Sequence, residues 1–261
     1  MRAQFGVVAL FATTFACFVN DVAHAAPSIG RFEPTDLHMA EPGDLEVDTQ
    51  VGLSMLEGSN DHLVLPDFEL NLGVTRRVEI DVDGSFTLER FTLKSREYLG
   101  EPLWVGVKLG VADWRDDAKR RAFALGLQLG PLLPTTSNMH GIGYGGLALA
   151  GLVRGRLQLV FNAGALYAPR YDALSDEPPA RIVGGVDLHL AIDKQERWAL
   201  LGELGGSFYW THDFHELTAT AGVGWDVSDH FTLSAIALGN AFANGERVSF
   251  LLGFTPKVKL W

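Results

Sequence analysis

The sequence predicts an all-β protein: an up-and-down antiparallel transmembrane β-barrel of about twelve strands, within a range of ten to fourteen. Three observations support this prediction. Segments in which every second residue is apolar recur along most of the 261-residue chain. The connections between these segments alternate between short and long. Finally, no segment carries apolar residues at the three- and four-residue spacing of an amphipathic helix over a useful length.

Residues 78–89 show the strand pattern clearly. Val78, Ile80 and Val82 alternate there with Glu79 and Asp81. Successive side chains of a strand point to opposite faces, so this segment has one apolar face and one acidic face. Similar segments predict further strands over residues 45–55, 67–75, 103–111, 122–130, 142–152, 155–167, 181–193, 197–210, 215–227, 230–239 and from about 246.

The links between the predicted strands alternate in length. Short links are expected at residues 76–77, 154–155, 194–196 and 228–229, and longer ones at 56–66, 90–102, 131–141 and 168–180. An up-and-down barrel with short turns at one rim and longer loops at the other has this arrangement. Two links fit poorly, because 112–121 is long and 241–245 is short for its place.

The apolar strand faces could contact either lipid or a protein core, because both arrangements alternate. Eight strands enclose an interior that side chains can fill, whereas wider barrels open into channels. A twelve-stranded barrel with its small apolar residues inside would leave a void, so we expect these residues to face lipid and the polar residues to face inward. A two-sheet sandwich is the competing arrangement.

The N-terminus has the features of a cleaved export signal, predicted over residues 1–25. Arg2 precedes an uncharged apolar stretch, residues 5–19, and small residues surround a cleavage point after Ala25 or one residue later. The apolar stretch is shorter than the roughly 20 residues that a spanning helix needs. We expect an extended segment over residues 26–43 and the transmembrane barrel over residues 44–261.

The composition excludes several function classes. Removing the predicted signal takes away one basic and one acidic residue, so the net charge remains −11. Because phosphate affinity depends on Lys and Arg, we expect no nucleic-acid partner. Cys17, the one cysteine, lies in the predicted signal, which leaves the mature chain without disulfides or thiolate chemistry.

Four segments carry a resemblance to a known family: EPGDLEVDTQVGLS, LPDFELNLGVTRRVEIDVDGSF, GLQLGPLLPTTS and GVGWDVSDHFTL. From about Glu41 to Trp261, the chain resembles the outer-membrane barrel proteins of the "MetA-pathway of phenol degradation" group. The resemblance implies a porin-like outer-membrane protein of a Gram-negative bacterium. It also implies passive uptake of small, often aromatic or hydrophobic, molecules. The expected partners are outer-membrane lipid, a small-molecule cargo and the assembly machinery of the outer membrane.

Aromatic residues near strand ends suit the girdles that flank the apolar band of a membrane barrel. Outer-membrane barrels usually also end on an aromatic residue in phase with the lipid face. Here Trp261 has the opposite parity to Val258 and Leu260, and Pro256 could shift the phase by a bulge or kink. The girdle candidates are Trp104, Tyr167, Trp198, Tyr209, Trp210 and Trp225.

Charged residues on the polar strand faces are the candidate lumen-lining residues. They are consistent with two interpretations: an acidic wall that favours cations in a pore, or a hydrated lumen balanced by basic residues elsewhere. The acidic candidates are Glu46, Asp48, Glu69, Glu79, Asp81, Asp83, Asp187, Glu203 and Asp226, and the basic candidates are Lys108, Arg156, Arg181 and Arg197.

No catalytic, cofactor or metal site is predicted. Residues 211–216 contain histidine and carboxylates, but a structural zinc site needs four ligands in fixed geometry. Asp187 and His189 share a strand face, but no serine of matching parity is evident as a nucleophile. The alternatives to a channel are an outer-membrane enzyme acting on lipids and a structural barrel without transport.

Overall fold

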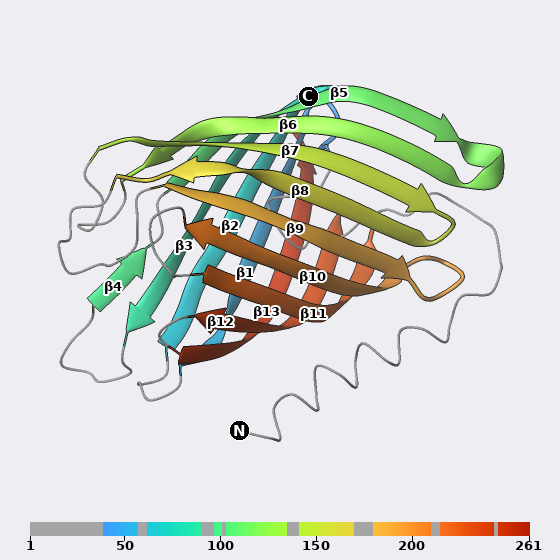
Figure 1. The fold of residues 1–261 in the computed structure, drawn as a ribbon. Helices are drawn as coiled ribbons and strands as arrows, with labels where there is room; N and C mark the ends of the chain where they lie inside the picture. Colours follow the sequence, from blue (N-terminus) through green and yellow to red (C-terminus); the bar gives the residue numbers. More distant parts are fainter. Residues whose placement is uncertain are drawn as a thin grey trace.

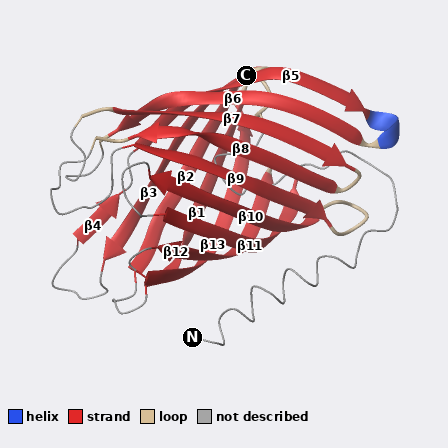
Figure 2. Ribbon diagram, viewed as in Figure 1, coloured by secondary structure: helices blue, strands red, loops and turns tan. Residues whose placement is uncertain are grey.

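The computed structural model describes residues 39–56, 62–89, 97–100, 103–134, 141–169, 180–209, 215–242 and 245–261. The predicted export signal and residues 26–38 of the predicted extended segment lie outside the described residues. Strands make up almost all of the described chain, and the short 3-10 helix η2 (Asp117–Lys119) lies between two of them (Figure 2).

Twelve of the described strands form one closed antiparallel ring (Figure 1), and the predicted transmembrane β-barrel is confirmed. Each strand of the ring pairs with the ring strands that come before and after it in the chain, and β1 pairs with β13 to close the ring. The short strand β4 (Glu97–Gly100) pairs with β3 outside the ring. The ring strands are β1 (Asp44–Leu56), β2 (His62–Thr75), β3 (Val78–Glu89), β5 (Leu103–Asp116), β6 (Arg121–Leu133), β7 (Gly143–Arg154), β8 (Leu157–Tyr167), β9 (Ala180–Ala191), β10 (Trp198–Tyr209), β11 (His215–Ser228), β12 (Phe231–Phe242) and β13 (Gly245–Lys259).

The two rims of the barrel differ in their connections. Residues 76–77, 117–120, 155–156, 192–197 and 229–230 make short turns at one rim, where β1 also begins and β13 ends. We call it the short-turn rim. Most of the connections at the opposite rim are longer, as the sequence predicts, although residues 243–244 alone separate β12 from β13.

The long link predicted over residues 112–121 is wrong. β5 continues to Asp116, and its register against β6 shifts between Gly110 and Ala112. A bulge inserts one extra residue into a strand, so the apolar residues change phase beyond it. Alternation therefore ends at Val111 in the sequence, although the strand continues.

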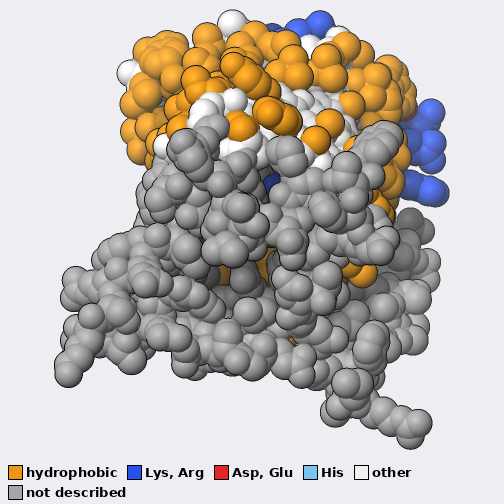
Figure 3. Space-filling view, turned by 60° about the vertical axis from the view of Figure 1, so that its left-hand side comes forward, with side chains coloured by type: hydrophobic (Ala, Val, Ile, Leu, Met, Phe, Trp, Pro, Cys, Tyr) orange, Lys and Arg blue, Asp and Glu red, His pale blue; other side chains and the backbone are white. Residues whose placement is uncertain are grey.

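The apolar strand faces point outward. Leu204, Phe250 and Leu252 are 51%, 55% and 57% exposed, whereas Glu79 and Asp81 are fully buried on the opposite face. Figure 3 shows hydrophobic side chains covering the visible outer surface of the described strands. A surface of this kind suits hydrocarbon, and ring closure satisfies the backbone groups within it. Among the described residues, no helix is long and apolar enough to cross a membrane.

The aromatic candidates separate into two groups. Trp198 and Trp225 are partly exposed on the outer face and stack with ring centroids 5.3 Å apart, and Tyr167 is also exposed there. Trp104 is instead buried on the inner face against Leu132, so its assignment to the girdle is wrong. Trp104 has the same parity on β5 as Lys108, which places its side chain inside the barrel. The side chain of Tyr209 and the whole of Trp210 lie outside the described residues.

The C-terminus lies beside the start of β1. The backbone N–H of Leu260 donates to the carbonyl of Gly43 at 2.7 Å, and Lys259 Nζ lies 2.8 Å from Asp44 Oδ1. Gly43 has a positive φ of 85°, and a Cβ there would lie 2.6 Å from the carbonyl oxygen of Trp261. This packing holds the last residue against the end of β1, where the ring closes.

Candidate functional site: the inner wall of the barrel

The acidic side chains of β1, β2 and β3 form two rows across the inner wall. The strand register places Glu46, Asn71 and Asp81 in one row, and Asp48, Glu69 and Asp83 in the next. Alternation turns all six residues to the same face. Five of them are buried, and Asp83 is half-buried.

A buried ion pair lies next to these rows. Lys108 Nζ is 3.0 Å from Glu79 Oε1, and the two side chains are 2% and 0% exposed. Lys108 and Glu79 are register partners on β5 and β3, and Lys108 also lies opposite Gln128 on β6. Gln128 Nε2 donates to Asp81 Oδ2 at 3.0 Å. The hydrogen-bond donors on β5 and β6 thus contact the carboxylates of β3.

Two further contacts join the acidic rows to β13. Lys257 Nζ lies 3.6 Å from Glu46 Oε2. The hydroxyl of Thr255 donates to the carboxylate of Asp48. Glu46 and Asp48 thus have partners on the strand that closes the ring.

The chain entering β1 packs against the same part of the wall. The backbone N–H of Ala40 donates to the Glu79 carboxylate, and Ala40 is buried. A Cβ on Gly73 would lie 2.4 Å from the Ala40 carbonyl oxygen, so only glycine leaves room for this segment. A Cβ on Gly110 would lie 3.3 Å from Met39 Sδ. Residues 39–41 therefore lie inside the short-turn rim, against β2, β3 and β5.

A second pair of carboxylates lies on the other side of the barrel. Asp187 on β9 and Glu203 on β10 are register partners, and both are half-buried. Asn162 Nδ2 donates to Asp187 Oδ2 at 3.2 Å, and Thr220 Oγ1 donates to Glu203 Oε2 at 3.2 Å. Two carboxyl groups thus lie side by side on the inner face, and each accepts a hydrogen bond from a neutral donor.

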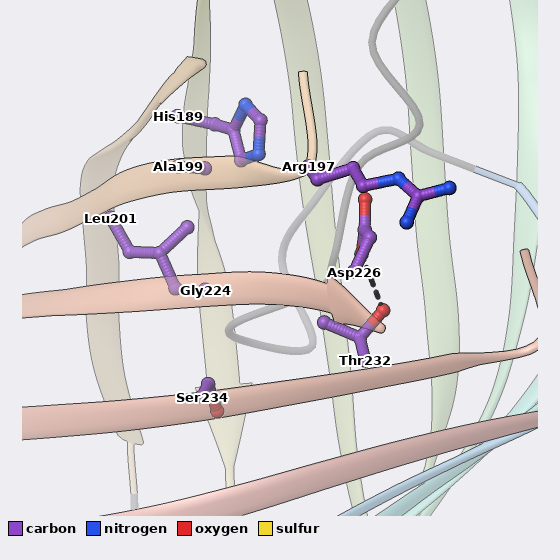
Figure 4. Close-up of a pocket in the computed structure, with 8 residues that line it drawn as sticks. All are labelled: His189, Arg197, Ala199, Leu201, Gly224, Asp226, Thr232 and Ser234. Carbon is purple, nitrogen blue, oxygen red and sulfur yellow. Dashed lines mark hydrogen bonds between the residues drawn. The ribbon is translucent and has the colours of Figure 1, made fainter. Parts of the chain in front are cut away.

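A small pocket lies between β9 and β12 near the short-turn rim (Figure 4). It contains about 240 Å³ of space not filled by atoms, part of it open to solvent. Because this space includes open solvent, the enclosed cavity itself is far smaller than the roughly 300–1,000 Å³ of most small-molecule sites. Asp226 accepts a hydrogen bond from Thr232 Oγ1 at 2.6 Å. The lining residues are His189, Arg197, Ala199, Leu201, Gly224, Asp226, Thr232 and Ser234.

The predicted basic residues do not gather at one place. Lys108 lies within the inner wall, Arg156 lies in the turn before β8, and Arg181 lies near the start of β9 at the opposite rim. Arg197 is exposed in the turn before β10 and lines the pocket. The predicted acidic residues form the two groups described above, with Asp226 at the pocket.

Two polar residues and part of the apolar wall lack a sequence signal that marks them as part of the site. Asn71 and Gln128 are buried among the inner carboxylates, and each has the parity of its charged neighbours on that face. On β7, Leu147 and Leu149 are buried inside while Leu152 is exposed outside. Because both faces of β7 are apolar, alternation alone could not orient that strand.

The described residues hold no group of three or more histidine, cysteine, aspartate or glutamate side chains suited to a metal ion. Residues 211–214 of the histidine-rich stretch lie outside the described residues, and nothing is described of the His215 and Glu216 side chains.

No family model matches the chain, and no curated protein matches it. The resemblance to the "MetA-pathway" group therefore stays a prediction.

Among solved structures, the chain is similar to the NanC porin, with a TM-score of 0.56 and 11% identity over 81% of this chain and 100% of that one. It is less similar to the KdgM porin, with a TM-score of 0.48, 7% identity, and coverage of 81% and 98%. For the CymD monoaromatic hydrocarbon channel the TM-score is 0.44, with 8% identity and coverage of 84% and 89%. The likeness to NanC shows that this chain has the fold of a porin.

Proposed function

We propose that the protein is an outer-membrane channel for the passive uptake of small molecules. The observation that carries this proposal is a charged and polar inner wall within a closed barrel whose outer face is apolar. Polar groups inside the ring contribute no hydrophobic stabilisation. A polar inner wall instead suits a route for water and solutes. The fold shared with a porin supports the same conclusion.

The proposed route follows β8 to β12 and not the acidic rows. The inner side chains of Asn71, Glu79 and Asp81 are fully buried, so solutes do not reach them in this structure. Asp187, Glu203, Thr218 and Ser234 are half-buried along the other side. The small pocket near the short-turn rim also lies on that side.

The finer proposal on cargo is that aromatic or hydrophobic molecules pass through the barrel. It rests on the family resemblance, and apolar inner residues such as Leu201 and Ile236 are compatible with it. Growth of a deletion strain on a panel of aromatic carbon sources tests it. Selective loss of growth on one of them supports uptake through this protein, whereas unchanged growth on all of them contradicts it.

Conductance in planar lipid bilayers tests the channel itself. We expect the purified protein to give discrete openings, after heat-modifiable gel mobility has shown that the barrel is folded. A folded protein that gives no openings would contradict the proposal.

An outer-membrane enzyme is the competing function, and the pocket is where it would act. His189 on β9 and Ser234 on β12 both line the pocket, but three strand spacings separate their backbones, about 14 Å at the usual strand separation. A nucleophile and its base need contact within about 3.2 Å. Ester hydrolysis that is lost in His189→Ala, from a protein without conductance, would favour the enzyme.

A further inference from the structure

Two arginines lie side by side on the outer surface at the short-turn rim. Arg121 is the first residue of β6 and Arg154 the last of β7, and they are direct register partners. Both are exposed, and they have the outward parity of the next register pair on that face, Phe123 and Leu152. Directly opposed like charges destabilise a sheet, and arginine does not lose its charge.

Neighbouring cations at this rim have carboxylate partners. Arg77 pairs with Asp113 at 3.2 Å, and Lys259 pairs with Asp44 at 2.8 Å. Within the described part of the chain, Arg121 and Arg154 form no ion pair. Their two positive charges are therefore not compensated by the protein that the structure describes.

The carboxylate closest to this pair in the register has another role. Asp116 lies opposite Arg121, but its side chain accepts a hydrogen bond from the Lys119 backbone N–H at 3.2 Å at the start of η2. Asp116 also pairs with Lys119 Nζ at 3.5 Å. Asp116 is thus turned toward η2, and the arginine pair is left facing outward.

The arginine pair adjoins the apolar surface of the barrel. The next row toward the middle of the barrel holds Trp114, Phe123 and Leu152, all exposed and in register. Aromatic residues of membrane barrels lie at the interface between headgroups and acyl chains. The arginine pair thus lies at the height of lipid phosphates, and Figure 3 shows Lys and Arg side chains at the margin of the hydrophobic surface.

We propose that Arg121 and Arg154 bind the phosphate of an anionic phospholipid whose acyl chains lie along Phe123 and Leu152. Two guanidinium groups from adjacent strands supply planar donors that match phosphate oxygens. The bound anion would also relieve the repulsion between them. The proposal requires only that the barrel spans a bilayer and does not depend on what passes through it.

Native mass spectrometry of the full-length protein folded in detergent micelles tests this site. The protein is titrated with phosphatidylglycerol, phosphatidylcholine and inorganic phosphate. We expect phosphatidylglycerol to bind most tightly, and Arg121→Gln/Arg154→Gln to raise its Kd by roughly tenfold, since each basic residue near a lipid surface contributes measurable attraction. Inorganic phosphate at equal concentration should not displace the lipid, because it has no acyl chains.

The matched control is Arg76→Gln/Arg115→Gln, which removes two cations from turns and strand ends at the same rim. An equal rise in Kd for this control would overturn the proposal, because general charge would then explain binding. Displacement of the lipid by inorganic phosphate would contradict the proposal, because the site would then bind free anions. An unchanged Kd for phosphatidylglycerol in Arg121→Gln/Arg154→Gln would show that the two arginines form no lipid site. If the double variant fails to fold by gel mobility, Arg154→Gln replaces it: a severalfold rise supports the site, and an unchanged Kd rejects it.

Discussion

Lys108 carries an ammonium group in a part of the wall that water does not reach. Its partner Glu79 accepts from two sides, from Lys108 Nζ at 3.0 Å and from the backbone N–H of Ala40. The pair therefore links β5 to β3 and β3 to the chain that enters β1. Charges taken out of water are tolerated only when they are paired and hydrogen-bonded.

Substitution of Lys108 tests this dependence. Lys108→Met leaves the Glu79 carboxylate buried without its cation, and we expect the free energy of unfolding to fall by about 3–5 kcal/mol. Urea titration in lipid vesicles, with the folded fraction followed by heat-modifiable gel mobility, measures it. Lys108→Met/Glu79→Gln removes both charges and keeps an acceptor for Ala40, so most of the loss should be recovered. A double variant as unstable as the single one would show that charge burial is not the cause.

Alternation predicted the strands of the ring well because lipid and the inner wall impose opposite demands on successive residues. The predicted strand over residues 78–89 has the same bounds in the structure. Prediction failed where the alternation itself changed. The bulge near Val111 reversed the phase of β5, and the short strand β4 has no long alternating pattern to reveal it.

The candidate site was less predictable than the strands. Parity identified Glu79, Asp81 and Lys108 as residues of one face, but it carries no information on which groups touch across strands. The contact between Gln128 and Asp81 depends on the register of three strands, β3, β5 and β6. Residues 39–41 lie ahead of the first strand and have no periodic pattern, so their packing on the wall had no signal in the sequence.

Adjacent residues on β10 test which face of a strand contacts lipid. Leu204 points outward near the middle of the strand, and Glu203 points inward beside Asp187. We expect Leu204→Lys to lower stability by about 2–4 kcal/mol, the usual cost of a cation at the lipid face near the midplane. Glu203→Lys places its ammonium beside Asp187 and should be tolerated. The same urea titration compares the two variants, and equal losses would contradict the assignment of faces.

Charge is distributed unevenly between the inner wall of the barrel and the short-turn rim. The net charge is −11, yet the rim turns hold many of the basic residues, including Arg76, Arg77, Lys119 and Lys194. The half-buried carboxylates Asp187 and Glu203 lie on the proposed route, whereas all but one of the six residues in the rows of β1 to β3 are buried. Electric fields act most strongly where a channel is narrow and poorly solvated. Asp187 and Glu203 should therefore influence ion permeation more than the exposed charges of the rim turns do.

Ion selectivity therefore provides the last test. If the route passes Asp187 and Glu203, the channel should prefer K⁺ to Cl⁻, and Asp187→Asn/Glu203→Gln should lower the permeability ratio by about twofold or more. The reversal potential across a planar bilayer under a KCl gradient measures this ratio. Asp117→Asn/Asp229→Asn removes two carboxylates from exposed turns and should change the ratio little, since solvent screens them. Equal changes of the permeability ratio in both variants would mean that the overall charge of the rim sets selectivity. If the ratio changed in neither variant, the route would lie elsewhere in the barrel.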